Sequence, residues 1–385
     1  MFPLNVGVTA IVARRKGEER QEDAQHCLRQ SIVLISILAI VMSVISFFVA
    51  RPLMELAGAK EDTVDPATQY FMIISVGFIV NALSMAICAA LRGIGNTRVT
   101  MKVNIVANVV NVVFNYLLIE GHFGFPRLEV AGAAVATVIG QVVGLVLALV
   151  AVFKKDSYLH LGFRDNWRLE KEMVGSLVRV GGNAALEQVA MRIGFFLTTR
   201  IVADLGTVNF AVHQICMQIL SLSFNFGDGI GTATTSLVGQ NLGRKRPDLS
   251  ILFGKIGQRM AITVSVALII AMVAGRYFFI SLFSNDPEII ARGAFIMVVM
   301  AAIMPIQMSQ VVVAGSLRGA GDTRFVANTM LLTVMVIRPL MTYLCIYPFG
   351  MGLVGAWAAM AVDQLVRLFM VYKRFAGGRW SQIKL

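Results

Sequence analysis

The chain has 385 residues, of which 57% are hydrophobic and 15% are charged, and its formal net charge is +12. This composition excludes an ordinary soluble domain, because uncharged apolar runs recur at about the 20 residues that a helix needs to cross a bilayer. The four cysteines show no CxxC spacing, and neither an HExxH motif nor a GxxxxGK[ST] loop occurs. The sequence therefore predicts an all-α integral membrane protein without a cofactor.

The predicted spans follow one another along the whole chain. A short apolar segment, residues 1–13, precedes about ten full spans, near residues 30–52, 68–91, 100–119, 130–153, 177–203, 207–239, 250–275, 289–317, 324–347 and 352–373. Lys and Arg gather in every second connection, which the positive-inside rule places in the cytoplasm. The positive charge is thus explained by topology in a lipid bilayer, with no nucleic-acid partner, and the expected location is the cell (cytoplasmic or inner) membrane.

One phrase occurs twice, each time at the end of an apolar helix. LRGIGNTR at 91–98 returns as LRGAGDTR at 317–324, and further matches in the same order pair Thr9 with Thr235, Gly132 with Gly355 and Gln141 with Gln364. Glycine permits a tight turn, and the arginine of each phrase can reach lipid phosphates. Two like halves are typical of secondary transporters. The expected domains are residues 1–153, a cytoplasmic linker at 154–173, and residues 174–385.

These segments resemble the multidrug and toxic compound extrusion (MATE) transporters. The resemblance covers essentially the whole chain and rests on LRGIGNT at 91–97, VAGAAVAT at 130–137, SLVGQNLG at 236–243 and LRGAGDT at 317–323. It implies two pseudo-symmetric six-helix bundles that export organic cations and other amphipathic compounds, driven by inward flow of Na⁺ or H⁺. Comparison of the two halves predicts that this chain lacks the first helix and most of the second.

Glu187 is the first candidate for ion coupling. It lies mid-span, where an ionisable group is costly and is usually retained for a function or for a partner. A carboxylate there can hold a proton or coordinate Na⁺, and it can release either one when a cavity changes the side it faces. The resemblance adds that an acid on this helix contributes to cation binding in the family. The alternative is a glutamate that is simply paired with an arginine.

Two further acids are expected inside spans. Asp228 stands among Gly227, Gly229 and Gly231, where a loosened helix could offer backbone carbonyls to a cation. A helix break that faces water is the alternative. Asp363 has Arg367 one turn away and Arg338 on the preceding helix, so a structural ion pair is favoured over a coupling role.

An asparagine stripe marks the first half. Asn111 and Asn115 share a helix face with Asn104 and Asn108, and interhelical hydrogen bonds alone would account for it. Some MATE proteins bind a cation with an Asn and an Asp at this spacing, a Thr on the next helix and an Asp on the first helix. Asn111 and Thr137 match this pattern, but Asn115 replaces the acid and the first-helix Asp is not in this chain, which weakens the cation hypothesis there.

A substrate cleft is expected in the second half. Gln307 and Gln310 lie beside Pro305, which should kink their helix. Three methionines are on helices that face the central cleft in the family, where flexible thioethers accept ligands of many shapes. Loose packing and lipid contact are the alternative. The candidate cleft residues are Gln307, Gln310, Met191, His213, Met217 and Met308, with a packing histidine favoured over a proton relay at His213.

The predicted function is cation-coupled antiport by alternating access, not enzymatic catalysis, with amphipathic or cationic small molecules as substrates. A lipid-linked oligosaccharide flippase of related fold is one alternative. It would favour several basic residues inside the cleft, whereas arginines within the spans are mainly Arg192, Arg200, Arg338 and Arg367. An inactive truncated transporter is the other alternative. A membrane enzyme would need a catalytic cluster, which the four scattered histidines do not provide.

Overall fold

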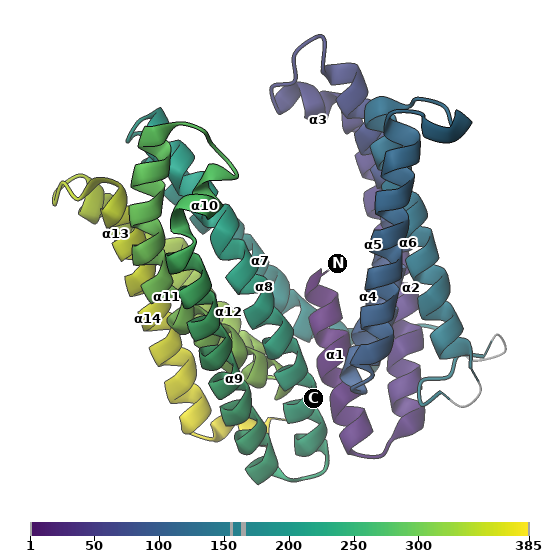
Figure 1. Cartoon of the computed structure of the whole chain (residues 1–385). Coiled ribbons are helices and arrows are strands. Elements are labelled where there is room, and N and C mark those ends of the chain that lie inside the picture. Colours follow the sequence, from purple (N-terminus) through teal and green to yellow (C-terminus); the bar gives the residue numbers. More distant parts are fainter. Residues whose placement is uncertain (1, 155–156, 163–166, 384–385) are drawn as a thin grey trace. The chain divides into compact units, whose positions relative to one another are not determined.

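A computed structural model describes residues 2–154, 157–162 and 167–383 (Figure 1). The described residues form helices and their connections. The elements are α1 (Phe2–Gly17), α2 (Gln21–Phe48), α3 (Ala50–Leu56), α4 (Val64–Gly93), α5 (Thr97–Ile119), η1 (His122–Gly124), α6 (Glu129–Phe153), α7 (Lys171–Ala203), α8 (Thr207–Gly243), α9 (Pro247–Ala274), α10 (Arg276–Ser281), α11 (Pro287–Gly319), α12 (Thr323–Met330), the π-helical turn η2 (Leu331–Ile337), α13 (Arg338–Ile346), α14 (Gly352–Ala376) and η3 (Arg379–Gln382).

Eight helices in the described part are long and apolar enough to cross a membrane, with α12 through α13 acting as one span, Thr323–Ile346. The other two predicted spans are α7 and α8, which are 33 and 37 residues long but more polar. Helix α7 carries Glu187, Arg192 and Arg200, and α8 is rich in Asn, Gln, Ser and Thr. Polar residues in a membrane bundle are retained where they face protein or water. The polar residues of α7 and α8 are therefore candidates for a functional site.

The chain divides into two compact units, Met1–Arg179 and Val180–Leu385. The division falls within α7 rather than in the predicted linker, residues 154–173. Described residues of that segment join the core of the first unit, where Leu159 and Leu161 are buried with Leu28 of α2. The backbone carbonyl of Tyr158 also accepts hydrogen bonds from two glutamines of α2. The described part of this segment thus packs against the first unit.

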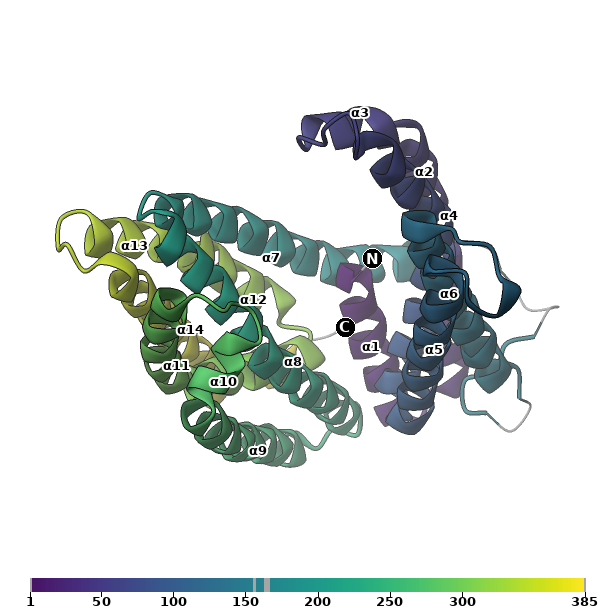
Figure 2. The same ribbon diagram turned by 45° about the horizontal axis from the view of Figure 1, so that its top comes forward.

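In the first unit, α2, α4, α5 and α6 run side by side, and α1 packs against α2 and α4 (Figure 1). In the second unit, α11 is central and packs against α8, α9 and α14 (Figure 2). Within each unit the Lys- and Arg-rich connections, such as α4–α5 and α8–α9, lie at one end of the helices (Figure 1). This is the alternation that the positive-inside rule requires.

The internal repeat is reproduced in single hydrogen bonds. Thr9 Oγ1 of α1 donates to the Ala89 carbonyl of α4 at 3.0 Å, and Thr235 Oγ1 of α8 donates to the Gly315 carbonyl of α11 at 2.8 Å. Ala89 and Gly315 are separated by the same interval as Thr9 and Thr235. Each half therefore builds the same helix contact.

The repeated glycine phrase has a packing role at this contact. A Cβ atom on Gly93 would meet the Thr9 carbonyl oxygen at 2.9 Å, and one on Gly319 would meet the backbone of Thr235. Only glycine permits such close approach of two helices. The second glycine of each phrase, Gly95 or Gly321, has a φ of 84° or 90° and ends the helix in the left-handed region.

Candidate functional site

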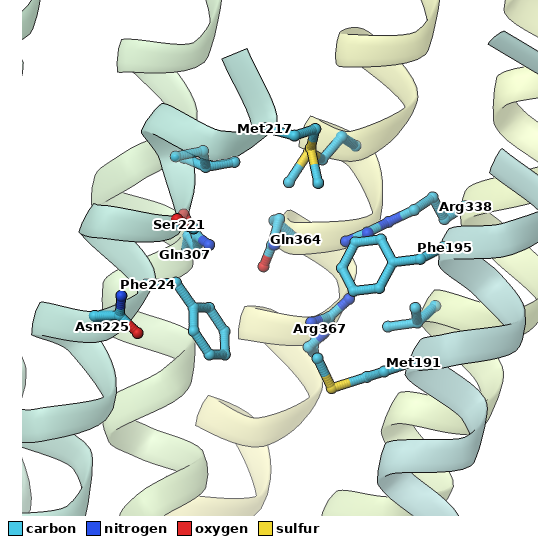
Figure 3. Close-up of a pocket in the computed structure, with 13 residues that line it drawn as sticks. Met191, Phe195, Met217, Ser221, Phe224, Asn225, Gln307, Arg338, Gln364 and Arg367 are labelled. Carbon is cyan, nitrogen blue, oxygen red and sulfur yellow. The ribbon is translucent and has the colours of Figure 1, made fainter. Parts of the chain in front are cut away.

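A cavity of about 200 Å³ lies inside the second unit, among α7, α8, α11, η2, α13 and α14 (Figure 3). Its wall is mainly apolar, with polar groups that converge from several helices. The lining residues are Met191, Phe195, Met217, Leu220, Ser221, Phe224, Asn225, Gln307, Val334, Arg338, Met360, Gln364 and Arg367. An apolar cavity with a few placed polar groups is the usual form of a small-molecule site.

The two arginines of the wall are held by one carboxylate. Asp363 is fully buried on α14 and accepts a hydrogen bond from Arg338 Nε at 2.8 Å. Arg367, one turn along α14, donates through Nη2 to both carboxylate oxygens at 2.6 and 2.7 Å, and its Nε donates to Thr333 Oγ1. Arg338 also lies over the Phe195 ring, 4.9 Å from its centroid. Because two arginines from different helices hold this one buried carboxylate, Asp363 is a structural anchor.

Glu187 has one charged partner among the described residues. Its carboxylate accepts a hydrogen bond from Arg318 Nη2, and the Glu187 residue is 5% exposed. One turn earlier on α7, Asn183 Nδ2 donates to Thr323 Oγ1 at 3.1 Å. Arg318 is the arginine of the repeated phrase, and it contacts this acid. The last turn of α11 thus brings a cation to the acid of α7, a contact that no spacing within α7 could reveal.

Asp228 lies in an unbroken helix. The sequence predicted a loosened segment around Gly227–Gly231, but α8 continues from Thr207 to Gly243. Thr234 and Thr235 donate to the carbonyls of Ile230 and Gly231, so these acceptors serve the helix itself. The expectation of freed carbonyls beside Asp228 is therefore wrong, because glycines in the middle of a packed helix are kept helical by their neighbours. Asp228 itself is half-buried.

The cleft residues expected from the sequence fall into two groups. Met191, Met217 and Gln307 line the cavity (Figure 3). Met308, Gln310 and His213 do not.

The three residues outside the lining are buried in helix contacts. Met308 is fully buried and packs with Ala261 and Val312. Gln310 is fully buried. His213 packs near Trp357, with ring centroids 5.5 Å apart. Helical rotation separates the groups, because Gln307 and Met308 point about 100° apart on α11.

Several lining residues were not predicted. Phe195 follows Met191 by one turn on α7, and Phe224 and Asn225 follow Met217 by about two turns on α8. Their helical spacing from the predicted methionines was the available signal. In the sequence, Gln364 stands out only as the repeat partner of Gln141. The repeat could have identified it as a site residue, since Gln141 lines a cavity in the first unit as well.

That first-unit cavity has about 240 Å³ and contains part of the asparagine stripe. Asn111 Nδ2 donates to Thr137 Oγ1 at 3.2 Å, and Asn115 Nδ2 donates to Asn111 Oδ1 at 3.2 Å. The structure thus brings together the three residues singled out in this half. The lining, Asn81, Ser84, Val103, Asn104, Ala107, Asn108, Asn111, Thr137, Gly140, Gln141 and Gly144, contains no charged side chain. The Asn111–Thr137 bond joins α5 to α6, whereas the Asn115–Asn111 bond lies within α5, so hydrogen bonding accounts for these contacts without a cation.

The two cavities occupy repeat-related positions. Asn81 of the first-unit cavity corresponds to Gln307 of the second-unit cavity, at the interval that separates the two glycine phrases. On the last helix of each half, Gly140 corresponds to Asp363 and Gly144 to Arg367. The interval is the one that separates Gln141 from Gln364. The first half therefore has glycines, which carry no side chain, at the positions where the second half has its buried charges. The charged cavity is a specialisation of the second unit.

These features define a multi-pass membrane protein built from two related helical units with internal cavities. A family model for MatE matches residues 1–117 and 184–344. The chain therefore belongs to the MATE family of transporters, and it is a transporter rather than an enzyme. The prediction of a MATE-type fold is confirmed.

The relatives and solved structures agree with this assignment. A protein described as "Uncharacterized transporter YisQ" from Bacillus subtilis is 27% identical over 379 residues, covering 98% of this chain and 83% of its own length. A "Probable multidrug resistance protein NorM" from Thermotoga maritima is 26% identical over 389 residues, covering 99% and 82%. A structure entitled "Outward-facing conformation of a multidrug resistance MATE family transporter of the MOP superfamily" superposes with a TM-score of 0.90 at 21% identity, covering 98% and 84%.

Proposed function

We propose that this chain is a cation-coupled antiporter of the cell membrane, which exports amphipathic small molecules in exchange for inward Na⁺ or H⁺. Family membership and relatives named as multidrug resistance proteins support export. The observation that carries the coupling role is the Glu187–Arg318 pair, a buried acid on α7 held by a cation at the end of α11.

The pair is suited to exchange because its two members belong to different helices. Asp363 is held by Arg338 and Arg367 together, so its charge is neutralised from both sides. Within the described residues, Glu187 has Arg318 as its one charged partner, and the Arg318 side chain is 16% exposed. A small shift of α7 against α11 separates this single contact, and a proton or a Na⁺ ion can then neutralise the carboxylate. We propose that Glu187 alternates between Arg318 and the coupling ion.

The other candidate sites rank below Glu187. Asp363 serves as the structural anchor described above. Asp228 is half-buried on an intact helix. In the first unit, Asn111, Asn115 and Thr137 offer neutral oxygens to a cation without a carboxylate, which favours a hydrogen-bonding role. The cavity residues Met191, Met217 and Gln307 are proposed to contact the substrate.

The test is Glu187→Gln, which keeps shape and most hydrogen bonding while it removes the charge. We expect this variant to lose ethidium efflux from cells and gradient-driven transport in proteoliposomes, at unchanged membrane abundance. Glu288→Gln is the matched control, because Glu288 is exposed in the first turn of α11. Applying a Na⁺ gradient and a pH gradient separately identifies the ion. Normal efflux by Glu187→Gln at equal abundance would transfer the coupling role to Asp228 or Asp363.

A further inference from the structure

The charged side chains beside the second-unit cavity do not balance. Arg338 and Arg367 line it, and Asp363 is the carboxylate that both contact. Glu187, another acid that acts electrostatically on Arg367, is already paired with Arg318. These five groups together carry three positive charges and two negative ones. Their net charge is therefore +1, although each of the three arginines contacts a carboxylate.

The arginines keep hydrogen-bonding capacity on the cavity side. Arg338 donates from Nε and Nη2, and Arg367 donates from the same two atoms. No hydrogen bond from the Nη1 group of either arginine is found among the described residues. A guanidinium has five N–H donors in a fixed fork that matches carboxylate and phosphate oxygens. The wall thus retains donors of the kind that bind an anionic group.

Two amides on the wall also lack partners. Gln307 Oε1 and Gln364 Oε1 are buried without a hydrogen-bond partner in the described part of the chain, and Figure 3 shows both side chains at the cavity. A buried amide oxygen without a partner is unfavourable. Because rotation of the amide exchanges its oxygen and nitrogen, each glutamine can also present N–H donors to an anion.

Apart from Ser221 and Asn225, the rest of the wall is apolar and adaptable. Its apolar side chains are Met191, Phe195, Met217, Leu220, Phe224, Val334 and Met360. Thioethers and aromatic rings form a surface for a flat, hydrophobic ligand body. Asp228 lies about one turn beyond Asn225 on α8 and is not part of the wall.

From this arrangement we infer that the second-unit cavity binds small organic anions, with the apolar body of the ligand against Met191 and Phe195 and its carboxylate, sulfonate or phosphate beside Arg338 and Arg367. This inference rests on the proposed export function and specifies its substrate class. It departs from the sequence-based expectation of cationic substrates. The physical reason is that a second cation would add to an uncompensated buried charge, whereas an anion neutralises it.

The test compares two ligands that share a ring system and differ in charge. The full chain is reconstituted in phosphatidylcholine nanodiscs, and 2-naphthoate and 2-naphthylmethylammonium are measured by equilibrium dialysis against empty nanodiscs. We expect 2-naphthoate to bind at least tenfold more tightly, which corresponds to about 1.4 kcal/mol. Equal or tighter binding of the ammonium compound, or binding of neither, overturns the inference.

Two variants locate the effect in this cavity. Gln364→Glu and Gln307→Glu each place a carboxylate on the wall and cancel the excess charge, so the preference for 2-naphthoate should fall at least tenfold. Gln382→Glu is the matched control, because Gln382 is exposed in η3, and it should keep the preference. A preference that persists in both wall variants overturns the assignment.

Lipid phosphate is the other source of an anion. If phosphatidylglycerol as a minor component of the nanodiscs abolishes 2-naphthoate binding, the pocket belongs to lipid, and the assignment to soluble anions is overturned. All of these measurements are made without an ion gradient. Failure here therefore removes the anion preference alone, whereas normal efflux by Glu187→Gln removes the coupling proposal.

Discussion

Removal of Asp363 should destabilise the second unit more than removal of one of its arginines. Asp363→Asn keeps the side-chain size but leaves Arg338 and Arg367 buried together, each 3% exposed, without a countercharge. Breaking a buried ion pair in this way costs about 3–5 kcal/mol. Arg338→Met leaves Arg367 and Asp363 as a neutral pair, whose contacts of 2.6 and 2.7 Å remain. Arg338→Met should therefore lower the free energy of unfolding only by the value of its hydrogen bonds to the charged Asp363, about 1.5–3 kcal/mol.

The assay is thermal denaturation in detergent followed by fluorescence-detected size-exclusion chromatography. The expected order of melting temperature is wild type, then Arg338→Met, then Asp363→Asn, and membrane abundance should follow the same order. Arg367→Met should resemble Arg338→Met, because it also leaves a one-to-one pair. If Asp363→Asn melts at the wild-type temperature, or above Arg338→Met, the charge balance drawn for this cluster is wrong.

Two further predictions concern packing and topology. Gly319→Ala should lower the free energy of unfolding by about 1–3 kcal/mol, because its Cβ would meet the Thr235 backbone. Gly229→Ala, with no atom within 4 Å of its Cβ, should keep the wild-type melting temperature or raise it. Equal effects of the two substitutions would refute the close-approach argument. Cysteines at Lys245 and Arg324 should resist an impermeant maleimide added to intact cells, while one at Glu61 reacts, and external labelling of either basic loop would contradict the charge-based orientation.

The sequence by itself was enough to predict the class, the repeat and one ion pair. The length of an apolar run indicates a membrane span directly, since the thickness of the bilayer sets the number of residues that a helix needs to cross it. Asp363 and Arg367 stand four residues apart on one helix, so their contact follows from helical geometry. Thr9 and Thr235 were matched by position, and their equivalent hydrogen bonds show that the repeat is structural.

Contacts between helices depended on the tertiary structure. Glu187 and Arg318 are 131 residues apart, and periodicity along α7 or α11 says nothing about which residues meet across them. The same limit explains Met308, which lies beside Gln307 in the chain yet points away from the cavity. A sequence reports the face of each helix, but helix rotation and crossing decide which faces meet and which charges remain unbalanced inside.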